Sequence, residues 1–241
     1  MWRLLDSDLR DAAYTAAADE AILIARNEGV APSTLHFYRR DAPAVSIGYF
    51  QKTRECVDLE AAAAENVSLV RRMSGGSAIY TDSGQLIYSL TVDRSEVPGT
   101  EGEAFERVCR ALIDALSMLG IEATHHRPND VLVRGRKISG SAQVRRGSIV
   151  ALHGTILVDT DLDRMERVLR SAKRTAGGMT SIAIELGTAP PMSDVKSAVV
   201  SGFRRAFGTG ISEGSMSDRE NELTAHLVET KYSTAQHTFL R

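Results

Sequence analysis

Cysteine, lysine and proline are all scarce in this chain of 241 residues. Its two isolated cysteines, Cys56 and Cys109, form neither a disulfide framework nor a zinc site with the usual cysteine spacing. The 6 prolines are scattered, so no proline-rich linker divides the chain. An apolar run of about 18 residues, which a membrane-spanning helix needs, is also missing. These absences favour a protein of a reducing compartment with no membrane partner.

An excess of charge of one sign is missing as well. Lysine and arginine total 29 and aspartate and glutamate 31, which gives a net charge of −2 and argues against a nucleic-acid partner. The start of the chain has no cationic stretch followed by an apolar run, so the sequence predicts no signal peptide. With 43% hydrophobic residues, a chain of this length can bury a large core that needs no disulfide bonds or metal ions to stabilise it. We therefore expect a globular, cytoplasmic protein.

Hydrophobic periodicity predicts strands that cluster along the chain instead of alternating with helices. Helices are predicted over about 11–28, 57–65, 101–119, 161–170, 190–207 and 217–229. Strands are predicted over 34–39, 44–50, 68–72 and 78–92, with several more in 121–158. This order favours an α+β fold with helices on one side of the sheet. We expect one domain over residues 1–241, of which about 171–241 is a helical C-terminal portion.

The first segment that could carry chemistry reads R-R-M-S-G-G-S-A-I-Y over residues 71–80. Gly75 and Gly76 follow a predicted strand, and paired glycines let backbone N–H groups approach an anion closely. Arg71 and Arg72 supply fork-shaped donors for a phosphate or a carboxylate. The segment alone is equally compatible with a tight turn beside two solvated arginines.

Two later segments also combine small residues with a basic or titratable side chain. Lys137 begins the strand that follows a turn at Gly135, and Gly140 lets a ligand or a backbone come close. A lysine placed in this way can contact a carboxylate or an α-phosphate, although it could also face solvent. His153 lies in the most apolar predicted strand, where a histidine is more often a hydrogen-bonded core residue than a catalyst.

Together the three segments resemble the lipoate–protein ligase A family of the biotin/lipoate ligase superfamily. The matching runs are R-R-M-S-G-G-S-A-I-Y-T-D (71–82), N-D-V-L-V-R-G-R-K-I-S-G-S-A-Q (129–143) and H-G-T-I-L (153–157), in the family's order and spacing. The resemblance is strong from about residue 11 to 158. It implies a class II synthetase-like catalytic domain with a mixed β-sheet flanked by helices.

The resemblance implies that ATP activates lipoate to lipoyl-AMP, with release of pyrophosphate, before transfer to a specific lysine of a lipoyl carrier domain. It implies Lys137 as the catalytic residue and Asp130 as a ligand for Mg²⁺ bridged by the phosphates. The residues implied for ATP and lipoyl-AMP are Arg72, Gly75, Gly76, Ser77, Ala78, Ile79, Tyr80, Asn129, Asp130 and Lys137. Those implied for the lipoate pocket are Arg72, Gly76, Lys137, Ser139, Gly140, His153, Gly154 and Thr155.

The chain departs from the family in two respects. Ser77 stands where the family usually has a third glycine, which leaves the choice between lipoate and octanoate open. The chain is also short, and so resembles two-part ligases that work with a small, separate accessory subunit. The resemblance implies three possible acceptors: the E2 subunits of 2-oxo-acid dehydrogenases, a glycine-cleavage H-like carrier, or a lipoate-binding protein of sulfur metabolism.

Rival functions are available on the same fold. Octanoyl- and lipoyltransferases use a cysteine thioester, with the cysteine just before the G-x-K-I-x-G strand or after the H-G-T strand. Residues 127–131 contain no cysteine and none follows Cys109, which favours the ligase. A non-catalytic lipoyl-binding paralogue is supported by Ser77 and opposed by Lys137. A biotin ligase is disfavoured because residues 71–77 and 136–142 look like the lipoate branch.

Overall fold

The computed structural model describes residues 1–170 and 178–241, so that residues 171–177 of the expected C-terminal portion lie outside it. The strands are β1 (Trp2–Arg10), β2 (Thr34–Arg40), β3 (Ala44–Ile47), β4 (Ser68–Arg71), β5 (Ile79–Thr81), β6 (Gln85–Asp93), β7 (Thr124–His126), β8 (Asp130–Val133), β9 (Arg136–Arg146), β10 (Ile149–Leu157) and β11 (Ile211–Glu213). The helices are α1 (Ala12–Asn27), α2 (Thr53–Cys56), α3 (Leu59–Ala64), α4 (Glu101–Met118), α5 (Leu162–Val168), α6 (Ile182–Leu186), α7 (Met192–Phe207), α8 (Asp218–Leu227) and α9 (Ala235–Thr238), with short turns η1 (Arg94–Glu96) and η3 (Val228–Tyr232).

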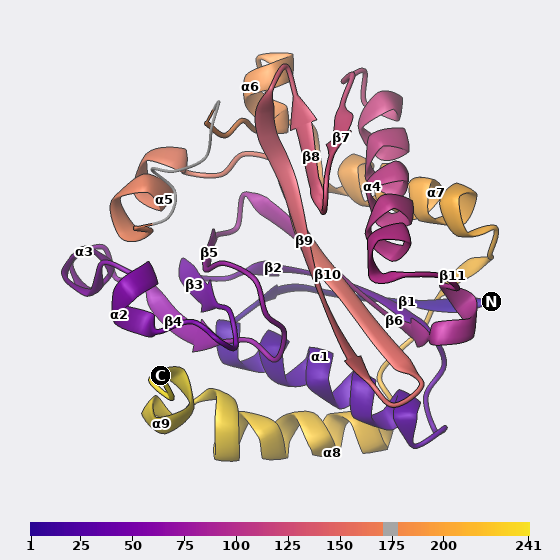
Figure 1. Cartoon of the computed structure of the whole chain (residues 1–241), viewed down its shortest axis with the longest axis horizontal. Coiled ribbons are helices and arrows are strands. Elements are labelled where there is room, and N and C mark those ends of the chain that lie inside the picture. The colour runs from indigo at the N-terminus through magenta and orange to yellow at the C-terminus, as the bar shows by residue number, and fades with distance from the viewer. Residues whose placement is uncertain (171–177) are drawn as a thin grey trace.

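The strands form a large mixed sheet and a small one (Figure 1). The order in the large sheet is β11-β1-β2-β6-β10-β9-β8-β7, and in the small sheet β4-β3-β5. Strand β1 runs parallel to β2 and β11. From β2 to β7 the neighbours are antiparallel. This is the mixed sheet flanked by helices that the sequence predicts.

Helices cover both faces of the large sheet, so the expectation of helices on one side is wrong. On one face, Asp19 of α1 accepts a hydrogen bond from Tyr38, which is paired with Ile87 on β6. The next residue of β6, Tyr88, points to the other face, where its ring packs 5.6 Å from that of Phe203 on α7. Clustered strands predict a sheet, but they do not indicate which face each helix covers.

Strands β1 and β11 are not predicted from the sequence because neither shows the regular alternation of a half-buried strand: β1 becomes polar along its second half, and β11 is short. β1 contains Asp6, Ser7 and Asp8 and is largely exposed over its second half. Its outer edge pairs Trp2 with Ile211, which brings β11 onto the sheet. The C-terminal portion therefore supplies one strand in addition to its helices.

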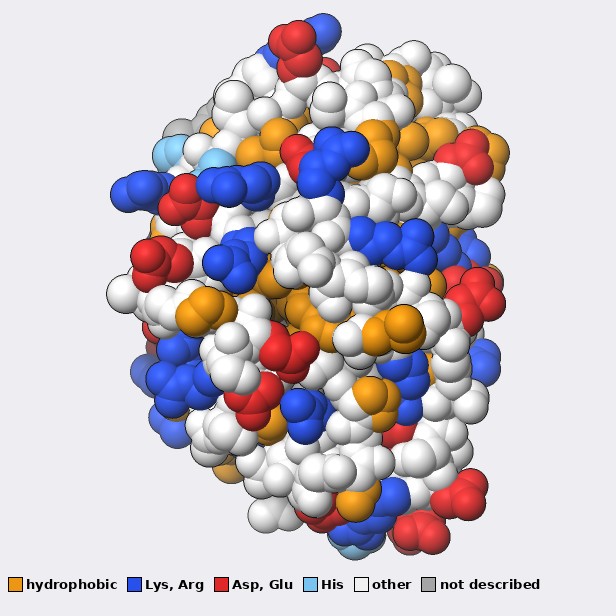
Figure 2. Space-filling model, turned by 90° about the vertical axis from the view of Figure 1, so that its right-hand side faces the viewer, with side chains coloured by type: hydrophobic (Ala, Val, Ile, Leu, Met, Phe, Trp, Pro, Cys, Tyr) orange, Lys and Arg blue, Asp and Glu red, His pale blue; other side chains and the backbone are white. Residues whose placement is uncertain are grey.

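None of the helices in the described ranges is both long and apolar enough to cross a lipid bilayer. Basic and acidic side chains are interspersed over the face drawn in Figure 2, in keeping with the net charge of −2.

Close packing of α7 on α4 gives a test of the fold. A Cβ added at Gly202 would lie 2.1 Å from the carbonyl oxygen of Ala111. We expect Gly202→Ala to push the helices apart and lower the free energy of unfolding by about 1–3 kcal/mol. Gly102→Ala is the control, since a Cβ there meets only Thr100 Oγ1, at 3.9 Å, and alanine favours the helix. Urea unfolding compares them, and equal losses would contradict the packing.

Candidate active site

One cavity of about 380 Å³ collects residues from all three motif segments. It is bounded by α1, by strands of the large sheet, and by the glycine loop, which we define as residues 73–78 between β4 and β5. Gly75 is the predicted site residue outside the cavity lining; its carbonyl accepts a hydrogen bond from Arg72. The predicted residues that line the cavity are Arg72, Gly76, Ser77, Ala78, Ile79, Tyr80, Asn129, Asp130, Lys137, Ser139, Gly140, His153, Gly154 and Thr155.

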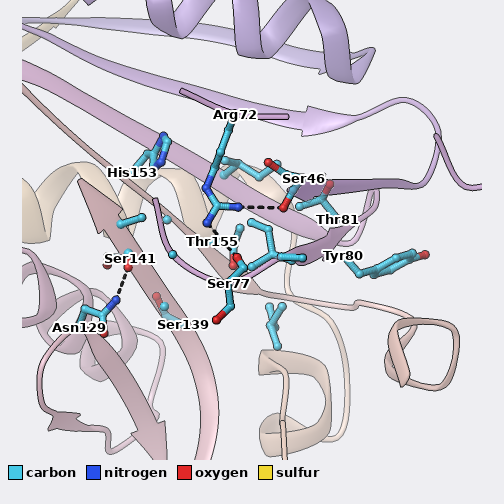
Figure 3. Close-up of a pocket in the computed structure, with 18 of the residues that line it drawn as sticks. Ser46, Arg72, Ser77, Tyr80, Thr81, Asn129, Ser139, Ser141, His153 and Thr155 are labelled. Atoms are coloured by element: carbon cyan, nitrogen blue, oxygen red, sulfur yellow. Dashed lines mark hydrogen bonds between the residues drawn. The ribbon is translucent and has the colours of Figure 1, made fainter. Parts of the chain in front are cut away.

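Arg72 holds the glycine loop against β3. Its Nη1 donates to the carbonyl of Ser46 at 2.8 Å and its Nη2 to that of Ser77 at 2.8 Å (Figure 3). Nη2 also donates to the carbonyl of Gly75 at 2.6 Å. Its Nε donates to Ser74 Oγ at 3.1 Å. Burial lowers the pKa of Arg72 to about 10, so the guanidinium stays charged at neutral pH. Because these acceptors are neutral, the charge remains uncompensated and favours an anion in the cavity.

Arg71 does not join this site, which corrects the expectation that both arginines bind an anion. Its side chain is fully buried and donates to the carbonyls of Gly48 at 2.9 Å, Gln51 at 2.7 Å and Thr238 at 2.9 Å. These bonds tie the chain after β3 to the C-terminal helix α9. Neighbouring residues of a strand point to opposite sides, so only Arg72 can face the cavity.

The packing of the glycine loop also requires a glycine outside the loop, at position 48. A Cβ at Gly48 would lie 1.9 Å from the carbonyl oxygen of Gly76. The backbone that follows β3 can therefore pack on the loop only with glycine at position 48. At Gly75, by contrast, a Cβ would meet only the ring of Phe50, at 3.5 Å.

Lys137 and Asp130 form an ion pair at the β8–β9 end of the cavity. The distance from Lys137 Nζ to Asp130 Oδ1 is 2.7 Å, and both side chains are about a quarter exposed. A Cβ at Gly140 would lie 2.7 Å from Nζ, so this glycine makes the room for the ammonium group. The backbone of Lys137 is fixed by hydrogen bonds to Gly178 and Thr180. This arrangement offers a positive charge that an incoming anion can share.

A buried polar network lies at the α1 side of the cavity. Asp19 accepts hydrogen bonds from Tyr38 Oη at 2.8 Å and from His36 Nδ1 at 2.9 Å. His153, which points toward the Arg72 side of the cavity in Figure 3, bonds Ser74 of the glycine loop. Although burial raises the pKa of the Asp19 carboxyl, the imidazole of His153, whose Nδ1 lies 3.9 Å away, and the hydrogen bond from His36 hold it well below its usual range. Asp19 therefore remains ionised and helps to fix His153.

Sequence reasoning missed Asp19, Tyr38 and Arg40, which all line the cavity. They come from α1 and β2, far along the chain from the three motifs. A signal was present: β2 carries the polar side chains His36, Tyr38 and Arg40 on one face, although all three positions are buried. Such a row indicates polar partners inside the fold.

Neither thiol of the chain belongs to this site. Cys56 and Cys109 are buried, and the lining of the described cavity includes neither of them. Burial raises the pKa of Cys56 and raises that of Cys109 to about 12. Since the sequence contains no other cysteine, no thiol is available to act as a nucleophile in the cavity.

The residues available for a metal ion are equally limited. Within residues 1–170 and 178–241, no three histidine, cysteine, aspartate or glutamate side chains gather as a metal site would require. A Mg²⁺ ion carried by phosphates needs only one or two protein carboxylates. Asp130 at the cavity wall fits this requirement as a single ligand.

Thiol reactivity tests the placement of the cysteines. With a pKa of about 12, Cys109 is a protonated, buried thiol at pH 8, and Cys56 is also buried. We expect Ellman's reagent to label the folded chain at least about 10²-fold more slowly than the urea-unfolded chain, since the thiolate is the reactive form. Fast labelling of either cysteine in the folded protein would contradict this placement.

Comparison with known proteins agrees with this geometry. Residues 11–204 match the family model of the lipoyl protein ligase A/B catalytic domain. Among curated relatives, the octanoyltransferase LipM of Symbiobacterium thermophilum is 33% identical, over 96% of this chain and 95% of the relative.

Solved structures agree as well. A bi-partite lipoate protein ligase from Thermoplasma acidophilum superposes with a TM-score of 0.88 at 28% identity, covering 99% of this chain and 97% of that one. A lipoate-protein ligase A bound with ATP gives a TM-score of 0.88 at 27% identity and covers 98% of both chains. The chain belongs to the lipoyl protein ligase A/B catalytic-domain family.

Proposed function

We propose that this chain joins a lipoyl or octanoyl group to a lysine of a lipoyl carrier domain, by way of an acyl adenylate made from ATP. The observation that carries the adenylate route is the composition of the cavity. It offers the cations Lys137 and Arg72 and a glycine loop, and it offers no thiol. The ATP-bound ligase among the structural neighbours supports the same route.

In the first step, a carboxylate oxygen of the acid attacks the α-phosphorus of ATP. The new P–O bond forms as the bond to pyrophosphate breaks, which leaves an acyl adenylate. Two anions must approach each other for this to happen. Lys137, Arg72 and backbone N–H groups of the glycine loop would stabilise the negative charge that develops at the phosphoryl group. Mg²⁺ would neutralise phosphate charge, with Asp130 as its protein ligand.

In the second step, the neutral amine of the carrier lysine attacks the acyl carbonyl. The amide bond forms, the bond to AMP breaks, and the lysine proton passes to solvent or to a nearby base. No enzyme nucleophile is needed, because the mixed anhydride is already activated. The ammonium of Lys137 would also stabilise the charge of the departing AMP.

A second candidate is an octanoyltransferase, favoured by the name of the relatives that match almost the whole chain. Transferases of this fold take the acyl group through an enzyme cysteine thioester, and the positions of Cys56 and Cys109 do not support this route. The adenylate route fits the cavity better, whereas the acyl group and the carrier are common to both candidates.

A direct comparison of donors separates the two candidates. An apo lipoyl domain is incubated with the chain and either lipoate or octanoate with MgATP, or an octanoyl carrier protein without ATP, and its mass is read. We expect the lipoyl domain to be acylated with MgATP, with release of AMP. The Cys56→Ala/Cys109→Ala variant should keep the full rate of this acylation. Modification only from the octanoyl carrier protein, and its loss in that variant, would establish the transferase instead.

The same assay tests the need for an accessory subunit. A structural neighbour is described as bi-partite, which supports the proposal that a small partner chain assists the adenylation step. Full activity of the isolated chain would remove this part of the proposal and leave the acyl transfer itself unaffected.

Lys137 is the residue that both steps share. We expect Lys137→Ala to lower the rate of carrier modification by about 10²–10³-fold, the usual loss when a charge-stabilising donor is removed. Lys196→Ala is the matched control, because Lys196 pairs with Asp6 and Asp8 at the surface, away from the cavity. The role is supported if the two variants are equally stable to heat and only Lys137→Ala modifies the carrier more slowly. A Lys137→Ala variant that keeps the wild-type rate would contradict it.

A further inference from the structure

The floor of the cavity crosses four strands of the large sheet in one row. Gly140 pairs with Thr155, Thr155 with Ile87, and Ile87 with Tyr38, and all of these residues line the cavity. Three strand spacings of about 4.8 Å make this row roughly 14 Å long. Lys137 lies over its Gly140 end. An acyl chain whose carboxylate meets Lys137 would therefore extend toward Tyr38.

The Tyr38 end of the row is polar and charged. Arg40 follows Tyr38 by two residues on the same strand face, and its guanidinium carbon lies 5.3 Å from the centre of the Tyr38 ring. Tyr38 and Arg40 both line the cavity. Asp19, which accepts a hydrogen bond from the Tyr38 hydroxyl, lines it as well. This end of the cavity thus contains a buried cation beside a buried carboxylate.

The guanidinium of Arg40 is only partly satisfied by the protein. Its Nε donates to Thr81 Oγ1 at 3.1 Å, and its Nη1 contacts Thr15 Oγ1 and the carbonyl of Asp11. Among residues 1–170 and 178–241, Nη2 has no hydrogen-bond partner and no carboxylate lies within 4.0 Å of the group. Arg40 is only 3% exposed as a residue, but Nη2 is not among the fully buried atoms that lack a partner, so water or a ligand in the cavity supplies its acceptor.

Arg72 provides the contrast inside the same cavity. Both of its terminal nitrogens already donate to backbone carbonyls. Figure 3 shows Thr81, the partner of Arg40, beside Ser46, on the side of Arg72 away from His153. Arg40 Nη2, which has no protein partner among the described residues, is therefore a different group from the Arg72 guanidinium that holds the glycine loop.

We propose that Arg40 makes the acyl pocket selective for a lipoyl chain over an octanoyl chain. An alkyl end would exclude water from Nη2 without offering it an acceptor, which is costly for a buried charge. The dithiolane of a lipoyl group is polarizable, and its sulfurs are weak acceptors. The inference rests on the proposed function only in taking a medium-chain acyl group as the ligand.

Calorimetric titration of the full chain with lipoate and with octanoate tests this selectivity without ATP or a carrier. We expect wild type to bind lipoate about tenfold more tightly, and Arg40→Met to bring the two affinities within about twofold. Arg39→Met is the matched control, because Arg39 points to the other strand face and pairs with Asp8. It should keep the wild-type ratio.

Equal affinities in wild type, an unchanged ratio in Arg40→Met, or no binding of either acid would each overturn the inference. Equal wild-type affinities would overturn the inference even where Arg40→Met fails to fold. Since the titration contains no ATP, an octanoyltransferase route would leave this result intact, and failure of the selectivity would leave the adenylate route intact.

Discussion

The architecture of the cavity depends on one buried guanidinium. Arg72 connects the carbonyl of Ser46 on β3 with the carbonyls of Gly75 and Ser77 in the glycine loop. Through this side chain the small sheet and the loop become one wall facing the large sheet. Its neighbour Arg71 connects the same region to the C-terminal helix, with backbone carbonyls as its main acceptors. Because the acceptors are neutral, the arginines order the wall and still leave a positive field, which suits a site that must attract anions.

The two ends of the cavity differ in their side chains, and we assign them different roles: binding of the carboxylate at one end and acyl-chain selectivity at the other. At the β9 end, the ammonium of Lys137 is paired with the carboxylate of Asp130, and both are partly exposed to the cavity. At the β2 end, the polar side chains are held in place by buried hydrogen bonds. The middle of the row is made of Thr155 and Ile87, which leave space without offering charge. A ligand would thus be oriented by the match of its carboxylate to the β9 end and of its other end to the β2 end.

Sequence alone identified the parts of the site that lie in continuous motifs. The glycine loop, Lys137 and His153 were identified as candidates because the three segments together resemble a known family, whereas each segment alone was compatible with a structural role; the structure brings all three to one cavity. Asp19 could not, because only the packing of α1 on the sheet brings it to the cavity, and the polar row of β2 indicated buried partners for Arg40 without indicating which cavity it lines. Strands β1 and β11 were missed for a related reason: β11 is placed by its pairing with the distant Trp2–Leu4, and neither strand has a regular local pattern. Arg71 was misassigned because a strand exposes alternate residues, and the sequence did not show which arginine faced inward.

The parallel pairing of β1 with β11 also orders events during synthesis. Trp2 lies at the start of the chain and its partner Ile211 lies near the end. The outer edge of β1 consequently stays open while most of the protein is made, and an open edge is a template for pairing with other chains. Among the described residues β11 pairs only with Trp2–Leu4, so the outer edge of the exposed second half of β1 has no strand partner in the folded protein either. Its charged side chains oppose strand addition by another chain both before and after β11 arrives, and long-range closure of this kind slows folding.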